Sequence, residues 1–166
     1  MSKEVEWAFK LPWDHIQQRA FTWDIDFKLV GAIIGVESAG DVFATRFEPS
    51  WPDQWLVSPS RFAKELQITV HTETNHQRTS WGLMQVMGAV FRELGYAGEL
   101  PESLDPDINL QYGCIKLMDL YHRHQNWIDV IAAYNAGNPK KVNGKYVNQL
   151  YVDKVLEKFY SIGGKL

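Results

Sequence analysis

Glu37 is an acidic residue that ends an apolar helical pattern. It follows Val30 by seven positions and Ile33 by four, so a helix places its carboxyl on their face. Desolvation on such a face favours the neutral acid and raises its pKa, and the negative end of the helix dipole acts in the same direction. A carboxylic acid that stays protonated near neutral pH can donate a proton to the leaving oxygen of a glycosidic bond. The alternative is an ordinary helix-end Glu that reaches solvent.

A second candidate is the segment GLMQV at residues 82–86, which places a glycine and an amide inside an apolar run. Gly82 allows a substrate or another part of the backbone to come close. Gln85 offers donors and an acceptor, which suit the N-acetyl and hydroxyl groups of a sugar. The alternative is that the apolar residues pack in the core and that Gln85 is a polar residue at the start of a helix.

The segment AYNAG at residues 133–137 puts a phenol and an amide in the last turn of a helix that Gly137 ends. Core packing is a serious alternative for Tyr134. Asn135 is harder to explain as a core residue, because a buried amide must find hydrogen-bond partners.

Four segments in this order resemble the catalytic set of the lytic transglycosylases, whose lysozyme-like domains cleave the glycan strands of peptidoglycan. These segments are Glu37-Ser38, residues 82–86, residues 133–137 and the stretch Tyr151-Val152-x-x-Val155. The resemblance extends from about Asp24 to Phe159 and is closest in style to phage-borne members. It implies a mainly α, lysozyme-like fold.

The resemblance also implies roles for individual residues. Glu37 is the expected catalytic acid, and the Tyr151 hydroxyl is expected to hydrogen-bond its carboxyl and fix its orientation. A substrate-binding role is implied for Ser38, Ser80, Met84, Gln85, Tyr134, Asn135 and Tyr151.

The spacing of the motifs departs from the family pattern in one place. The family commonly joins the Glu-Ser pair to the Gly-Leu-Met-Gln motif by a short loop, whereas residues 39–81 intervene here. We expect residues 41–80 to form an inserted, partly extended lobe on one side of the substrate groove. We expect one domain over residues 1–166, with residues 1–23 as an N-terminal extension.

The number of carboxylates at the site decides the mechanism, because glycoside hydrolases need a nucleophile or a base that faces the acid. No motif supports any of the candidates, which are Asp41, Glu48, Glu65 and Glu73. A lone acid suits a transglycosylase that releases a 1,6-anhydromuramoyl product. Two alternatives remain: a hydrolytic muramidase of the goose-lysozyme type, and a wall-binding virion module without turnover.

Composition excludes several other classes of protein. With 166 residues, 45% hydrophobic and 22% charged, the chain is typical of one globular domain. The single Cys114 cannot form an internal disulfide. The five histidines lack a His-Glu-x-x-His pattern, so we expect no metal and no cofactor. No basic run interleaved with aromatic residues favours nucleic-acid binding, and the expected partner is peptidoglycan, bound by a monomer.

The N-terminal residues lack the basic and apolar regions of a signal peptide, and no apolar stretch approaches the length of a membrane span. We therefore expect synthesis in the cytoplasm, no membrane insertion and action on the cell wall. A phage lysin or a virion component fits that combination. The six lysines after residue 138 leave a weak basic surface, for which a solvated helix face is the simpler explanation.

Periodicity and turn residues predict a mainly helical chain. Helices are expected over 13–20, from Asp24 or Asp26 to before Gly40, and over 58–66, 83–94, 105–122, 126–136 and 147–160. Residues 42–47 are expected to be extended, residues 68–80 to form a loop, and Asn143-Gly144 to form a turn. One side of the helix from residue 105 is expected to carry Ile108, Tyr112, Ile115 and Met118 or Leu117.

Overall fold

Helices make up most of the chain, as the sequence predicts. The computed structural model describes the backbone of residues 3–166 and the side chains from residue 5 onward. The α-helices are α1 (Trp13–Thr22), α2 (Phe27–Glu37), α3 (Pro59–Leu66), α4 (Val70–Gln77), α5 (Gly88–Glu93), α6 (Pro106–His124), α7 (Trp127–Ala136) and α8 (Gln149–Ser161). Short 3-10 helices are η1 (Lys3–Lys10), η2 (Asp53–Trp55) and η3 (Leu100–Leu104).

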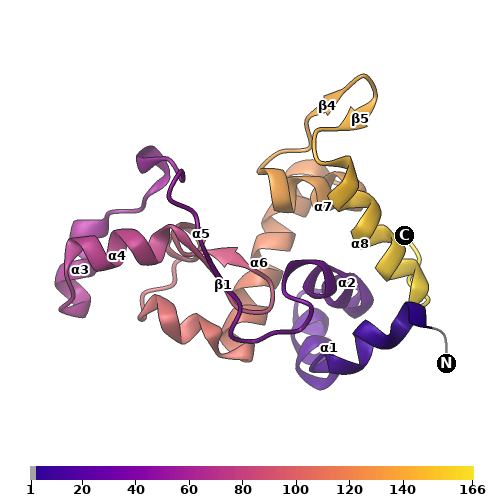
Figure 1. The fold of residues 1–166 in the computed structure, drawn as a ribbon, viewed down its shortest axis with the longest axis horizontal. Coiled ribbons are helices and arrows are strands. Elements are labelled where there is room, and N and C mark those ends of the chain that lie inside the picture. The colour runs from indigo at the N-terminus through magenta and orange to yellow at the C-terminus, as the bar shows by residue number, and fades with distance from the viewer. Residues whose placement is uncertain (1–2) are drawn as a thin grey trace.

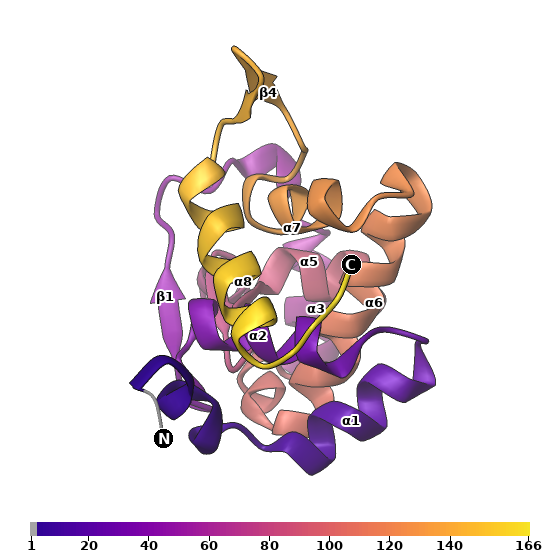
Figure 2. The ribbon, with the colours of Figure 1, turned by 90° about the vertical axis from the view of Figure 1, so that its right-hand side faces the viewer.

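Helix α2 lies in the centre of the larger group of helices. Its N-terminus is capped by Asp26, whose carboxylate accepts a hydrogen bond from the Lys28 amide at 2.8 Å. The helix thus begins at the second of the two expected positions. Every residue from Leu29 to Gly35 is buried, and the helix packs on α1 and α8 (Figure 2). The core therefore surrounds α2 until its last turn, where Glu37 lies.

A small antiparallel sheet separates this group from α3 and α4. Its strands β1 (Thr45–Phe47), β2 (Thr79–Trp81) and β3 (Val86–Met87) follow in that order, with β1 at an edge. Figure 1 shows α3 and α4 on one side and α1, α2 and α8 on the other, with α6 between them. The predicted extended segment at 42–47 is confirmed over its last three residues.

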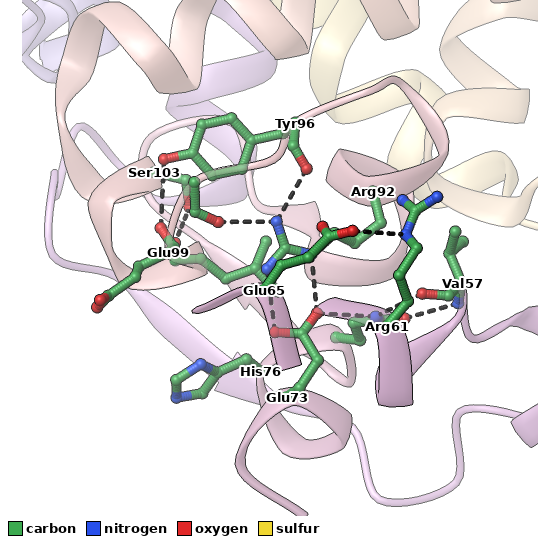
Figure 3. A network of polar contacts seen from close by, with 12 residues as sticks. Val57, Arg61, Glu65, Glu73, His76, Arg92, Tyr96, Glu99 and Ser103 are labelled. Carbon is green, nitrogen blue, oxygen red and sulfur yellow. Dashed lines mark hydrogen bonds and ion pairs between the residues drawn. The ribbon is translucent and has the colours of Figure 1, made fainter. Parts of the chain in front are cut away.

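The prediction of a loop over residues 68–80 is wrong. Helix α4 forms there because Thr69 caps it, with the Thr72 amide donating to the Thr69 hydroxyl, and because Glu73 and Gln77 are buried. Glu73 forms a fully buried ion pair with Arg92 of α5 (Figure 3). A segment with a polar composition is thus ordered by a partner distant in the sequence.

Three further predictions need correction. Residues 83–87 are a turn and a strand, so α5 begins only at Gly88. Ser58, expected as the first residue of α3, lies outside it with a φ of 42°, so the helix begins at Pro59. The fully buried face of α6 carries Asn109, Leu110, Gly113, Cys114, Leu117 and Leu120. Of these the prediction includes Leu117, and the rest of the expected face lies one position away.

The C-terminal part follows the local signals closely. The Asn126 carboxamide accepts hydrogen bonds from the first amides of α7, and Gly137 ends that helix with a φ of 78°. Asn143 and Gly144 form the predicted turn, with φ values of 52° and 78°. They join the strands β4 (Lys141–Val142) and β5 (Lys145–Tyr146) in a hairpin that projects from the helices (Figures 1 and 2).

Candidate active site

Glu37 is the last residue of α2, and its side chain is half-buried. The Tyr151 hydroxyl of α8 donates a hydrogen bond to its Oε1 atom at 2.6 Å. Sequence resemblance predicted this contact across 114 positions, and the structure contains it. The carboxyl is therefore held in one orientation while part of the side chain still reaches solvent.

Burial raises the pKa of Glu37 above its ordinary value. The hydrogen bond from Tyr151 and the positive charges of Lys116 and Arg46 lower it in part. Burial likewise holds the pKa of the Tyr151 phenol well above its usual range, so this hydroxyl stays a donor. The arrangement suits a carboxyl that donates a proton and then takes one back.

Ser38 connects the end of α2 to the segment 82–86. Its hydroxyl donates to the Leu83 carbonyl at 2.8 Å and accepts a hydrogen bond from the Gly40 amide at 3.2 Å. The chain then reverses through Ala39 and Gly40, both with positive φ. Ser38 thus fixes the position of the segment beside Glu37.

The segment 82–86 is a tight turn rather than the start of a helix. Gln85 has a φ of 46°, and its amide nitrogen Nε2 donates to the carbonyls of Ala44 and Gly82, each at 2.9 Å. Its Oε1 atom accepts a hydrogen bond from the buried Ser80 hydroxyl at 2.9 Å. Ser80 and Gln85, both predicted to bind substrate, are therefore hydrogen-bonded to each other. This contact holds the turn against β2.

A sequence model of one protein family matches this chain over residues 14–151, described as the Transglycosylase SLT domain. The match covers most of the chain and includes both Glu37 and Tyr151. The chain belongs to the SLT transglycosylase family. Comparisons with curated proteins and with solved structures give no match.

Membership of the SLT family carries a general function. Its members degrade peptidoglycan, which supports an enzymatic role for this chain on the cell wall. Residues 41–80 lie within the matched range. Their status as an insertion stays a prediction, as does that of residues 1–23 as an extension.

Two of the expected substrate contacts lie in the interior of the SLT domain. Met84 is 0% exposed, and its sulfur fills the space that a side chain at Gly113 would occupy. Tyr134 is 4% exposed, and its hydroxyl donates to the Met84 carbonyl at 2.8 Å. These buried side chains support the turn from the interior, and their substrate-binding role stays a prediction.

Asn135 differs from them because its side chain is exposed at the end of α7. Its Oδ1 atom accepts a hydrogen bond from Nδ2 of Asn148 at 3.0 Å, and the same nitrogen lies 3.0 Å from the Ala132 carbonyl. The Asn135 amide nitrogen is thus on the surface, where a substrate role stays a prediction.

The sequence interpretation missed two residues of α6. Asn109 is fully buried: its Oδ1 accepts from the Met84 amide at 2.8 Å, and its Nδ2 donates to the carbonyls of Trp81 and Ser103. Lys116 lies on the same face, two helical turns further on, and donates to the Tyr134 carbonyl at 2.9 Å. Asn109, Gly113, Lys116 and Leu120 follow one another at intervals of three or four positions, so all four share one face of the helix. A predicted face that starts at residue 109 instead of residue 108 includes both.

Neither a metal site nor a membrane span is found in the part of the chain that the structure describes. From residue 5 onward, where side chains are described, no group of three His, Cys, Asp or Glu side chains could hold a metal ion. Within the same residues no helix has the length and apolar character needed to cross a bilayer.

Replacing Tyr151 with Phe tests the orienting hydrogen bond. The ring packing is kept, but Glu37 loses a bond worth about 1.5–3 kcal/mol, as bonds to charged groups are. We expect turnover on peptidoglycan to fall about 10- to 150-fold, with little change in the melting temperature. Tyr134→Phe is the matched control, because it removes a hydroxyl bound to a backbone carbonyl and should lower stability more than turnover. Turnover near the wild-type value for Tyr151→Phe would contradict the orienting role.

Proposed function

We propose that this SLT domain is a lytic transglycosylase that cleaves the β-1,4 bond between N-acetylmuramic acid and N-acetylglucosamine, with Glu37 as its single acid and base. The observation that supports this proposal is the set of groups around the Glu37 carboxyl. The Tyr151 hydroxyl binds the carboxyl at 2.6 Å, and the charges of the described residues that act on its pKa are those of Lys116 and Arg46. A second carboxylate is not among them.

The contacts of the four candidate carboxylates agree with this proposal. Glu73 is fully buried in its ion pair with Arg92, and Glu65 pairs with Arg61 on α3. The remaining two are also engaged: Glu48 pairs with Arg46, and the Asp41 carboxylate accepts a hydrogen bond from the Phe43 amide.

A single carboxyl can catalyse the whole reaction if the substrate supplies the nucleophile. Glu37 gives its proton to the glycosidic oxygen as the bond from that oxygen to C1 of the muramoyl sugar breaks. The 6-hydroxyl oxygen of the same sugar then bonds to C1, and its proton passes to the Glu37 carboxylate, which restores the acid. Intramolecular attack replaces the missing second carboxylate by proximity, and no water is consumed.

The mass of the products tests this reaction. We expect a digest of purified peptidoglycan to contain 1,6-anhydromuramoyl ends, one water lighter than hydrolysed ends and resistant to borohydride reduction. Mass spectrometry before and after reduction measures both properties, and a digest with Glu37→Gln is the blank. Mainly reducible muramic ends would contradict the proposal and indicate the hydrolytic muramidase. An absence of lysis by the folded wild type would instead favour a wall-binding module. A role as a phage lysin or virion component stays a prediction.

A further inference from the structure

The Lys116 side chain is an unusual group to find beside a catalytic acid. It is half-buried on α6, its Nζ atom donates to the Tyr134 carbonyl at 2.9 Å, and it lies 3.7 Å from the centre of the Tyr134 ring. The contact with the ring adds a cation–π attraction. These contacts fix the ammonium group in place, although it is the tip of a flexible side chain.

The C-terminal ends of α7 and α2 determine what the positive charge of Lys116 can stabilise. The Tyr134 carbonyl belongs to the last turn of α7, and Glu37 lies in the last turn of α2. The C-terminal ends of both helices carry partial negative charge, which opposes the formation of a carboxylate nearby. Tyr134 connects Lys116 to the end of α2, because its hydroxyl donates to the Met84 carbonyl in the turn that Ser38 also binds. The positive charge of Lys116 lowers the pKa of Glu37.

We infer that Lys116 is a positioning residue for the reaction, one whose ammonium group stabilises the carboxylate that Glu37 becomes after it protonates the leaving oxygen. Without this charge Glu37 holds its proton too tightly to release it. The inference rests on the proposed role of Glu37 as acid and base, so its test must separate the two.

The charged and titratable groups that face this pair come from four elements. Tyr151 on α8 and Tyr134 on α7 have pKa values raised by burial, and both remain neutral. Arg46 on β1 is exposed and already paired with Glu48. On α6 itself, burial raises the pKa of Cys114 to about 12, so it carries no charge. Burial lowers the pKa of Lys116 to about 8, within reach of an ordinary titration.

The first measurement follows the carboxyl directly. In protein labelled with 13C at glutamate, the Glu37 carboxyl signal is identified by its loss in Glu37→Gln. Lys116→Met keeps the length of the stem and removes the charge, so the titration midpoint of Glu37 should rise by about one pH unit, the lower end of the range for an opposite charge. Arg46→Met is the matched control, and because its guanidinium is exposed and screened the shift should be smaller. An equal midpoint in wild type and Lys116→Met would overturn the inference.

The second measurement is the pH profile of kcat/KM on peptidoglycan. Its alkaline limb reports the loss of the proton from Glu37 in the free enzyme, so Lys116→Met should move this limb upward by about one unit and lower the turnover at the optimum. Lys116→Arg keeps the charge and should leave the limb in place. A lysine that only caps α7 would lower the melting temperature without moving the limb, and that outcome would overturn the inference.

The wild-type protein provides a test that needs no variant. Because Lys116 titrates near pH 8, the Glu37 signal should show a second, smaller inflection there. A signal without it would overturn the inference even if Lys116→Met does not fold. If the midpoint shifts as expected while the digest contains hydrolysed ends, the coupling between Lys116 and Glu37 stands and the proposed reaction fails.

Discussion

Replacing Glu37 with Gln is expected to slow the lysis of cell walls by about 100- to 10,000-fold, the contribution that a general acid and base makes. The amide is nearly the same size and can still accept the hydrogen bond from Tyr151, but it cannot cycle a proton. The rate of clearing of purified walls, measured beside the melting curve, tests this expectation. Lysis at a tenth of the wild-type rate with an unchanged melting curve would place the acid elsewhere.

The fold should survive this change because of the direction of the Glu37 pKa shift. Its folded-state pKa is raised above the ordinary value of 4.5. The stability that this shift contributes is therefore fully present below pH 4.5 and is lost as the pH rises through the folded-state pKa. Above that pKa the wild-type carboxyl gives no such benefit, so there Glu37→Gln should melt at or slightly above the wild-type temperature.

A matched control separates the acid from its neighbours. Glu48→Gln removes a carboxylate that pairs with Arg46 on β1, within the same region of the molecule. With a single catalytic carboxyl, this variant should keep more than a tenth of the wild-type rate. A loss as large as that of Glu37→Gln would instead identify a second catalytic carboxylate and favour hydrolysis.

Local signals in the sequence were enough to predict much of the fold. Asp26 and Asn126 cap their helices through hydrogen bonds to amides two or three residues away. Asn143 and Gly144 adopt the positive φ that their residue types favour. Each of these features depends on residues close together in the chain, which a reader of the sequence can see.

Local sequence signals do not predict the conformation of the segment 82–86. Its pattern is apolar and helix-like, but its conformation depends on three distant residues. Ser38 and Tyr134 donate hydrogen bonds to its carbonyls, and Asn109 accepts one from the Met84 amide. These contacts hold Gln85 in a left-handed conformation that residue type alone does not favour. Family resemblance identified the motif as important, whereas tertiary contacts decide its shape.

The candidate site was predicted through resemblance more than through periodicity. The contact between Tyr151 and Glu37 follows from the order of the motifs, and no local rule joins residues so far apart. Lys116 was missed because the buried face of α6 was placed one residue away. A lysine at a core position of a helix is a sequence signal in itself, because burying a charge is costly unless it has a partner.

The most severe loss of stability should come from Arg92→Met. Arg92 donates to both carboxylate oxygens of Glu73, at 2.8 and 3.0 Å, and to the carbonyls of Tyr96 and Gly98, and the side chains of the ion pair are 0% exposed (Figure 3). Methionine fills much of the space but leaves the carboxylate buried with Gln77 as its remaining donor. Breaking a buried pair in this way costs about 3–5 kcal/mol.

This cost can be measured by chemical unfolding, and the melting temperature should fall by roughly 6–20 °C for a chain of this length. The double variant Glu73→Gln, Arg92→Met distinguishes the charge from the packing, because it leaves no unpaired carboxylate. If the isolated charge is the cause, the double variant should be more stable than Arg92→Met by more than about 1 kcal/mol. A single variant that loses less than that amount would show that α4 is held by its packing on α3 and α5 and that the ion pair is dispensable.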